Sequence, residues 1–327
     1  MSSSYAALSL TNRRYIAHRA GPGMRGQDHG PPQVNKPSCL GDADTPPRHP
    51  RLENHMDAKL QRRVQRYGWD KAALEYEAGW RVQLEPAQTK MFELVQVAPG
   101  SAVIDIACGT GLVSRMAASL VGSSGTVFGT DISDVMVKSA QEAADLHGCA
   151  NTQFARMDAE KLQLEENSFD VALCALGLMY VPDPEQALRE MHRVLRAGGQ
   201  VAVAVWGQRN RCGWAEIFPI VDSRVKSEVC PLFFRLGSGD ALSQALVQAG
   251  FKDVVSARVE TILRYQTADE ACKATFEGGP VALAYDRFSD DVKRAAHADY
   301  LASIEPFRDG VGYLIPGEFV VAKGCKV

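Results

Sequence analysis

Short apolar runs alternate along the chain with longer segments in which apolar residues recur at helical spacing. The runs occupy residues 103–107, 126–131, 152–157, 169–178 and 200–206. Nearly continuous apolar runs of this length are typical of strands that are buried on both faces of a parallel sheet. The helical segments between them predict β-α-β units with short connections. We therefore expect an α/β protein with a doubly wound, mostly parallel sheet whose ligands bind at the carboxyl ends of the strands.

Capping signals place two of the predicted helices. Ser133 is a typical N-cap for a helix over 134–147. Asp183, followed by Pro184 and by Gln186 three residues on, predicts the start of another helix, which Gly198-Gly199 is expected to stop. The residues expected to face the core are Met136, Ala140, Ala143 and Ala144 in the first helix, and Ala187, Leu188, Met191, Val194 and Leu195 in the second.

Residues 1–55 differ from the rest in composition. They hold seven prolines and no periodic apolar pattern, so we expect a disordered extension or a targeting segment. Four arginines precede the first acid, Asp28, which is typical of a mitochondrial transit peptide within residues 1–27. Without such a role for this segment, the expected location is cytoplasmic.

The remaining chain divides into an N-terminal helical part and one large domain. Residues 56–98 predict two or three short helices, and residues 99–327 form the domain. Residues 207–237 begin at a strand end and predict an insertion that helps to form a substrate pocket. After a helix over 239–249 and a strand over 253–263, residues 266–316 predict a helical lid. A turn at Pro316-Gly317 then leads to a last strand, 318–323.

The composition of the 327 residues excludes several classes of function. Hydrophobic residues make up 46% and charged residues 23%, with a net charge of −3. There is no basic excess to bind phosphate backbones, so nucleic acid is not an expected partner, and no apolar run is long enough to span a membrane. The eight cysteines form no C-x-x-C pair, which indicates reduced thiols rather than a disulfide framework or a metal site.

The candidate chemistry centres on a glycine loop after the first strand. Gly109 and Gly111 allow a sharp turn and a close approach of a ligand to the backbone. Dinucleotide sites prefer a third glycine, but this loop has Ser114 there and an acid, Asp105, within the strand. The loop alone leaves three possibilities open: a tight turn without a ligand, a nicotinamide site, or a site for another adenosyl cofactor.

Two more acids follow the next strands. Asp131 ends the second strand, twenty residues after Gly111, where a carboxylate can accept hydrogen bonds from both ribose hydroxyls. Asp158 follows the third strand, where it can accept from an adenine amino group while the Ala159 amide donates to the ring. A helix-capping aspartate is the alternative for Asp158.

Four segments in this order resemble small-molecule class I methyltransferases of the ubiquinone/menaquinone-biosynthesis type. They are VIDIACGTG, FGTDIS, MDAEKL and FDVALCALGLMYVPDPEQALREMHRVLRAGGQVAVAVW. The resemblance is close over residues 95–206 and concerns only topology over 240–327. It implies a seven-stranded Rossmann-like methyltransferase fold, with the last strand antiparallel between the fifth and the sixth, and S-adenosyl-L-methionine as cofactor.

The resemblance also assigns roles to the motif residues. Asp105, Ala107, Gly109 and Gly111 would cradle the methionine part. Asp131, with Ile132 beside it, would bind the ribose, and Asp158 and Ala159 the adenine. The strand end at Ala175 would face the sulfonium, and an N-terminal helix carrying Tyr76 and Trp80 on one face would lie over the cleft. Those two aromatic residues are equally consistent with core packing.

The methyl acceptor is expected to be a small molecule, and the sequence leaves its reacting atom (O, N, C or S) and the oligomeric state open. Trp206 and Trp214 are typical of an aromatic, apolar acceptor site or of a core. No histidine is placed securely as a base: His192 is expected on the surface, His147 at a helix end and His297 in the lid. Candidates by position alone are Tyr180, Asn210, Trp214, Glu277, Tyr285, Arg287 and Tyr313.

Four other functions compete with this interpretation. An NAD(P)-dependent oxidoreductase would use the same kind of loop, and a non-catalytic S-adenosylmethionine-binding protein would keep the same acids. A nucleic-acid methyltransferase is disfavoured because Ala175-Leu-Gly-Leu replaces the expected Asn/Asp-Pro-Pro-aromatic motif. A thiolate-based metalloid methyltransferase would require Cys174, Cys212 and Cys230 to meet at the cleft.

Overall fold

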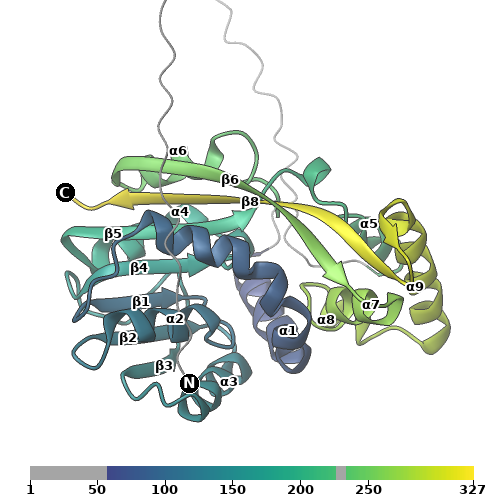
Figure 1. The fold of residues 1–327 in the computed structure, drawn as a ribbon, viewed down its shortest axis with the longest axis horizontal. Coiled ribbons are helices and arrows are strands. Elements are labelled where there is room, and N and C mark those ends of the chain that lie inside the picture. The colour runs from purple at the N-terminus through teal and green to yellow at the C-terminus, as the bar shows by residue number, and fades with distance from the viewer. Residues whose placement is uncertain (1–56, 226–232) are drawn as a thin grey trace, which may run out of the picture. The chain divides into compact units, whose positions relative to one another are not determined.

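The computed structural model describes residues 57–225 and 233–327, which build an α/β fold on one mixed sheet (Figure 1). The predictions for residues 1–55 and for Cys230 lie outside this part of the chain. The sheet has the order β3-β2-β1-β4-β5-β8-β6, and a short β7 pairs with β8. Its strands are β1 (Ala102–Ile106), β2 (Thr126–Asp131), β3 (Thr152–Arg156), β4 (Phe169–Ala175), β5 (Leu195–Trp206), β6 (Lys252–Tyr265), β7 (Arg308–Asp309) and β8 (Gly312–Cys325).

The predicted doubly wound topology is confirmed. Strands β1 to β5 are parallel, and β8 is inserted antiparallel between β5 and β6. Central strand β1 is buried on both faces, with no exposed surface at Val103, Ile104 or Ile106. This burial explains why the central strands are continuous apolar runs rather than alternating ones.

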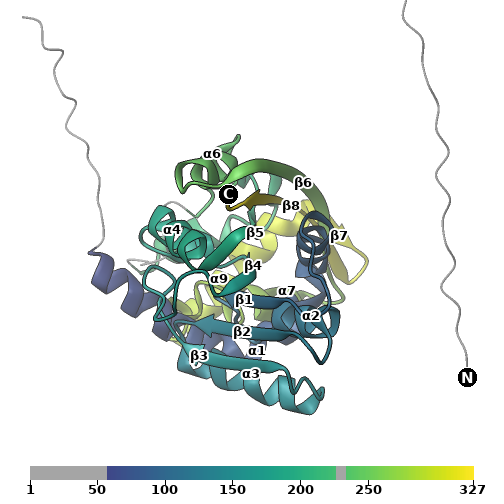
Figure 2. The same cartoon turned by 90° about the vertical axis from the view of Figure 1, so that its left-hand side faces the viewer.

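Helices cover both faces of the sheet, as Figure 2 shows by looking along the strands. They are α2 (Leu112–Val121) and α3 (Asp134–Leu146) on one face, and α4 (Pro184–Val194) and α6 (Ala241–Gln248) on the other. The predicted caps form: the Ser133 side chain accepts from the Met136 amide, and that of Asp183 from the Gln186 amide. The prediction that Gly198-Gly199 stops the second helix is wrong, because α4 ends at Val194 and β5 begins at Leu195.

The N-terminal part is one helix, α1 (Ala58–Leu94), and not the two or three short helices predicted. Gly79 is a contact point rather than a break, because a Cβ there would lie 2.8 Å from the Ala274 Cβ of α7 (Ala268–Phe276). The helix also continues through Pro86, which lacks an amide hydrogen. Packing against α7, α8 and the sheet therefore outweighs local helix propensity along α1.

The predicted lid at 266–316 is only partly helical. It contains α7, α8 (Ala282–Tyr285), α9 (Asp290–Ile304) and η3 (Glu305–Phe307), but β7 and the first residues of β8 also fall within it. The predicted turn at Pro316-Gly317 is wrong, since both residues lie inside β8 and pair with β6. Pro316 is tolerated because β5 pairs with β8 only from Phe319 onward, so this stretch of β8 has one neighbouring strand and needs no second donor.

The predicted insertion 207–237 is described up to residue 225 and from 233 on. It contains η2 (Arg209–Arg211) and α5 (Ile217–Asp222). Within the described residues, no helix combines the length and the apolar character that crossing a membrane requires.

Candidate functional site

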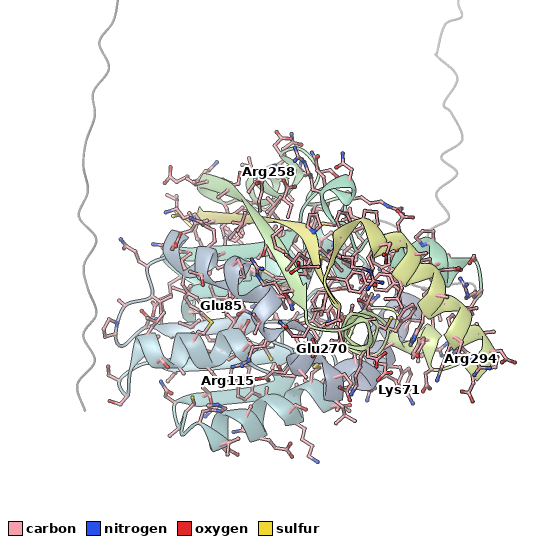
Figure 3. All side chains as sticks on the ribbon, turned by 45° about the vertical axis from the view of Figure 1, so that its right-hand side comes forward. Lys71, Glu85, Arg115, Arg258, Glu270 and Arg294 are labelled. Atoms are coloured by element: carbon pink, nitrogen blue, oxygen red, sulfur yellow. The ribbon has the colours of Figure 1, made fainter. Side chains whose placement is uncertain are left out.

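The loop between β1 and α2 turns sharply at the carboxyl end of β1. Gly109 and Gly111 have φ of +54° and +79°, and Ala107 has φ of +55°. An alanine in this left-handed region is strained, which is common where a loop shapes a binding site. Arg115 of α2, labelled in Figure 3, donates to the Thr110 carbonyl at 2.8 Å and to Glu77 of α1 at 2.8 Å. The loop is thereby held in place from both sides.

Asp105 lies beneath this loop with only 1% of its surface exposed. Ser114, at the position where a dinucleotide site prefers glycine, donates to Asp105 Oδ2 at 2.6 Å. Asp105 Oδ1 and Thr110 Oγ1 are buried and have no partner among the described residues. Burial raises the pKa of Asp105 to about 7, against the opposing Ser114 hydrogen bond. Asp105 is thus a buried acid that is paired at only one of its two oxygens.

Asp131 ends β2 and is fixed by the backbone. Its carboxylate accepts from the Gly109 and Ser133 amides, each at 2.9 Å. Burial raises its pKa to about 6, although these hydrogen bonds favour the charged form. A carboxylate held this way at the mouth of a cleft suits a ligand with hydroxyl donors.

The acids after β3 are paired with α1. Arg62 lies 2.9 Å from Asp158 Oδ2 and 2.6 Å from Glu160 Oε2. Glu160, which is 5% exposed, also accepts from the Asp183 amide at 2.8 Å. Burial raises the pKa of Glu160, and the Arg62 hydrogen bond opposes that rise. The Asp158 carboxylate, which the sequence assigns to adenine, thus pairs with the Arg62 guanidinium through Oδ2 and accepts from the Glu160 amide through Oδ1.

The end of β4 is packed against the glycine loop. Leu176 has φ of +62°, and a Cβ at Gly177 would lie 2.3 Å from the Ala107 Cβ. Only glycine fits there, because the loops after β1 and β4 are nearly in contact. The next turn, η1 (Leu178–Tyr180), places Tyr180 against α1 through Trp69, with ring centroids 5.0 Å apart.

These loops and α1 line a pocket that is here called the carboxylate cavity. Eight of the eleven predicted cofactor residues line it: Tyr76, Ala107, Gly109, Asp131, Ile132, Asp158, Ala159 and Ala175. Asp105 and Gly111 support the loop without lining the cavity, and Trp80 lies elsewhere. Lining residues not predicted for the cofactor include Arg62, Gln65, Trp69, Met136, Glu160 and Gly177.

A second, smaller pocket adjoins the first and is here called the aromatic chamber. It shares Trp69, Tyr76, Leu176 and Tyr180 with the carboxylate cavity. The rest of its lining is Trp80, Leu84, Trp206, Trp214, Gly278, Gly279 and Pro280. The Trp80 indole N–H donates to the Ala274 carbonyl at 3.1 Å, so Trp80 belongs to this chamber and to the contact of α1 with α7.

Of the acceptor-site candidates, Tyr180 and Trp214 line the chamber and five do not. Asn210 and Arg287 are exposed, and Glu277 directly precedes the lining residue Gly278 without lining the chamber itself. Tyr313 is buried and bonded to Arg308, and Tyr285 lies against His297, whose Nε2 is 2.9 Å from the tyrosine hydroxyl. The missed residue Trp69 precedes Tyr76 by seven positions, a helical spacing that would have identified it had 56–98 been predicted as one helix.

The histidines and cysteines within residues 57–225 and 233–327 line neither cavity. His192 is half-buried against Phe251 rather than on the surface as predicted, and His147 ends α3 with Nδ1 2.7 Å from the Ala143 carbonyl. Cys174 and Cys212 are buried, and burial raises the pKa of each thiol to about 12, so neither is a thiolate at neutral pH. Residues 57–225 and 233–327 contain no group of acids, histidines and cysteines that could hold a metal ion.

Comparison with known proteins supports the resemblance. A family model described as a methyltransferase domain matches residues 98–217. The demethylmenaquinone methyltransferase of Listeria welshimeri is 41% identical over 129 residues, which are 38% of this chain and 53% of that protein. The ubiquinone/menaquinone biosynthesis C-methyltransferase UbiE of Ectopseudomonas mendocina is 47% identical over 112 residues, or 34% of this chain and 44% of that protein. The chain thus spans about half the length of these relatives.

Solved structures share the fold at low identity. The [4+2]-cyclase SpnF covers 82% of this chain and 96% of its own, with a TM-score of 0.54 and 20% identity. Phosphoethanolamine N-methyltransferase 2 of Haemonchus contortus, solved with phosphomonomethylethanolamine and S-adenosylhomocysteine, covers 79% of this chain and 57% of its own, with a TM-score of 0.51 and 19% identity. These two likenesses establish the fold, and the sequence matches confirm the resemblance to class I small-molecule methyltransferases.

Proposed function

We propose that the protein transfers a methyl group from S-adenosylmethionine to a small-molecule acceptor, because residues 98–217 match a family model described as a methyltransferase domain. The observation that carries this proposal is the carboxylate cavity at the ends of β1 to β4. Asp131 lines it, and Asp105 lies buried beneath the glycine loop, and neither acid has a cationic partner among the described residues. A ligand with a positive charge and hydroxyl donors would compensate these acids, since a buried acid without a counter-charge is costly.

The residues present fit this cofactor. Asp131 would accept from the ribose hydroxyls, with Ile132 beside it. Asp158 and Ala159 would bind the adenine, and Ala107, Gly109 and Ala175 would bring the backbone close to the methionine part and the sulfonium. Asp105 and Gly111 do not line the cavity. Asp105 would act through its charge, and Gly111 by shaping the start of α2.

When bound, the cofactor supplies an activated methyl group, so the chain has to provide orientation and exclusion of water rather than a strong nucleophile. Tyr76, Trp69 and Tyr180 close the cavity toward the aromatic chamber. Apolar walls with fixed carboxylates favour a reaction in which positive charge disperses. Arg62 of α1 competes with adenine for the Asp158 carboxylate, so cofactor binding would be coupled to the first turns of α1.

Calorimetric titration with S-adenosylhomocysteine tests the proposal on the full chain. We expect saturable binding, no binding of NADH, and for Asp131→Ala a loss of about 10–100-fold in affinity from the lost charge-assisted hydrogen bonds. Asp134→Ala is the matched control, because Asp134 is exposed, pairs with Arg66 and lines neither cavity. Binding of NADH instead, or an unchanged affinity in Asp131→Ala, would contradict the assignment.

The class of methyl acceptor and the cellular compartment are part of the same proposal. A small molecule rather than nucleic acid is the expected acceptor because the chain lacks a basic excess. The cytoplasm is the expected compartment. Incubation with methyl-labelled cofactor and fractionated cell extract, followed by identification of the labelled product, would reveal the acceptor, and the absence of a label in every fraction would favour a non-catalytic binding protein.

A further inference from the structure

Among the described strands, β6 lies at one end of the sheet (Figure 2). It is 14 residues long and pairs only with β8, in antiparallel orientation. Successive residues of an antiparallel strand direct their amide and carbonyl alternately toward the neighbouring strand and away from it. Half of the backbone groups of β6 therefore point outward, away from β8.

A contact with α1 identifies which residues point outward. The Gln83 side chain donates to the Arg264 carbonyl at 2.7 Å and accepts from the Arg264 amide at 2.9 Å. Arg264 thus directs its backbone away from β8. The register with β8 is unbroken from residue 255 to residue 265, so the alternate residues before Arg264 do the same. They are Ser256, Arg258, Glu260 and Ile262, here called the open edge.

The open edge is bounded at both ends. At its start, pairing with β8 shifts between Lys252 and Val255, and Asp253 has φ of +50°. At its end, Gln83 takes the place of a neighbouring strand for Arg264 alone. Between these points, the outward amides and carbonyls have no hydrogen-bond partner within residues 57–225 and 233–327. Such an edge can pair with a strand of another chain.

The open edge is complementary to a second copy of itself. Two copies related by a two-fold axis meet antiparallel, and an axis at Val259 pairs all four outward residues of one copy with all four of the other. Arg258 of each copy then lies opposite Glu260 of the other. An axis at residue 258 would instead oppose two arginines. An axis at residue 260 would oppose two glutamates and would require Arg264, which Gln83 already covers.

The charges of the open edge suit this register. Glu260 is exposed and forms no ion pair among the described residues. Arg258, labelled in Figure 3, lies 2.7 Å from Glu318 Oε1 and donates to the Gly237 carbonyl at 3.1 Å. Both bonds use its terminal nitrogens and not Nε. Opposite charges on facing residues of antiparallel strands are stabilising, whereas like charges are destabilising.

We infer that the open edge of β6 is a dimerisation surface, on which a second copy of the chain continues the sheet antiparallel about a two-fold axis at Val259. A surface hollow beside the edge is lined by Val82 and Ile262, which are 60% and 42% exposed. The register brings Val255 of the second copy, itself 48% exposed, opposite Leu263 and next to this hollow. No residue of β6 lines the carboxylate cavity or the aromatic chamber, so the dimer leaves both unchanged.

Sedimentation velocity of the full chain over a wide concentration range tests the inference, and we expect a concentration-dependent dimer. Ser256→Pro removes an outward amide hydrogen that β8 does not use, and proline is tolerated at such a position of an edge strand. By symmetry the dimer loses two hydrogen bonds, so its dissociation constant should rise about tenfold or more. Ser256→Ala keeps the amide and is the matched control, with an unchanged dissociation constant.

A charge reversal tests the register. Glu260→Arg places arginine opposite Arg258 at both symmetric positions, so the dissociation constant should again rise about tenfold or more. Glu142→Arg makes the same change in charge on an exposed residue of α3, which packs against β3 at the other end of the sheet. It should leave the dimer unchanged.

Disulfide cross-linking locates the two-fold axis. In Val259→Cys the two new thiols face each other in a non-hydrogen-bonded pair, with Cα atoms about 4.5 Å apart, which a disulfide can bridge. In Ala257→Cys each thiol lies opposite Thr261, and the two thiols are about 13 Å apart. After mild oxidation, a non-reducing gel should show a dimer band for Val259→Cys but not for Ala257→Cys or the unmodified chain.

Three outcomes would overturn the inference. They are a chain that stays monomeric at every concentration, a dimer that Ser256→Pro and Glu260→Arg leave intact, and cross-linking through Ala257→Cys in place of Val259→Cys. Thermal unfolding shows whether each variant is folded. Sedimentation requires neither cofactor nor acceptor, and S-adenosylhomocysteine should bind Ser256→Pro as it binds the wild type, so this test is independent of the proposed function.

Discussion

The carboxylate cavity and the aromatic chamber share a wall but are built in opposite ways. Most of the first comes from loops that follow β1 to β4, and its chemistry lies in carboxylates and backbone groups. The second is assembled from α1, the end of β5, the segment after η2 and the loop after α7, and its lining carries no charge. Both cavities use α1 and the loop after β4, but the first adds neighbouring strand ends, whereas the second adds segments near Trp206, Trp214 and Gly278. The comparison teaches that the polar cavity follows from adjacent strand ends, and the apolar one from elements distant in sequence.

The carboxylate cavity depends on close packing between the loops after β1 and β4. Replacing Gly177 by alanine would bring a Cβ to 2.3 Å from the Ala107 Cβ and push apart the loops after β1 and β4. We expect a loss of about 1–3 kcal/mol in the free energy of unfolding and at least a tenfold loss in S-adenosylhomocysteine affinity. Urea unfolding and calorimetry measure the two effects.

Gly68→Ala is the control for that substitution, since its new Cβ would meet only the Leu283 Cβ at an ordinary 3.8 Å within helix α1. It should stabilise the protein slightly. If Gly177→Ala also leaves stability and affinity unchanged, the close contact does not shape the carboxylate cavity.

The buried acids at the carboxylate cavity predict that the free energy of unfolding depends on pH. The lining of the aromatic chamber is uncharged and adds no such dependence. The pKa values of Asp105 and Asp131 are raised by burial to about 7 and about 6, so the folded protein binds more protons than the unfolded chain above pH 4. The free energy of unfolding without ligand should therefore fall as pH rises from about 4 to about 7, by at most about 1.4 kcal/mol per pH unit for each acid.

Urea unfolding between pH 5 and pH 8 measures this slope, and Asp105→Asn should flatten it above pH 6. For Asp170, burial acts to raise the pKa, but hydrogen bonds from Ala102 and Arg196 outweigh it and lower the pKa. Asp170→Asn should therefore leave the slope above pH 5 unchanged. A stability that rises with pH across this window would show that the two acids are compensated in the folded protein.

Aromatic substitutions test whether the wall between the cavities is shared. Trp69 lines both, while Trp206 lines only the chamber. We expect Trp69→Phe to weaken S-adenosylhomocysteine binding by about 3–10-fold, because contact area with that ligand is lost. Trp206→Phe should leave this affinity unchanged, and calorimetry with S-adenosylhomocysteine measures both variants. Loss of S-adenosylhomocysteine affinity in Trp206→Phe would mean that the cavities are not separate sites.

The smallest expected effect concerns Arg62. Its ion pair with Asp158 competes with the proposed adenine contact, so Arg62→Gln should tighten S-adenosylhomocysteine binding by about 2–5-fold. Arg66→Gln, which removes an ion pair to Asp134 outside the cavity, should change nothing. Weaker binding in Arg62→Gln would instead indicate that the guanidinium contacts the ligand.

The fold up to Trp206 could be predicted from the sequence, because the patterns that indicate its strands and helix caps involve residues close together in the chain. The strands through Trp206, the caps at Ser133 and Asp183 and the acids after β1 to β3 all depend on near neighbours in the chain. The roles of those acids toward a cofactor stay predictions. The partners of Asp158 could not be predicted, because Arg62 comes from a helix almost a hundred residues earlier.

The other elements depend on contacts that local patterns do not encode. Gly79 and Pro86 indicate breaks in α1, but packing against α7 and the sheet keeps the helix continuous. Pro316-Gly317 indicates a turn, yet the end of β5 leaves room for proline within β8. The chamber is harder still, since its tryptophans meet only when α1 crosses the ends of the strands.

The position of β8 has a consequence for biosynthesis. β6 joins the sheet only through β8, which is the last of the sheet's strands to be synthesised. Until residues 312–325 have left the ribosome, β6 has no strand to pair with, and its long edge is open to other chains. Chaperone dependence during translation should therefore be concentrated in the interval between the synthesis of these two strands.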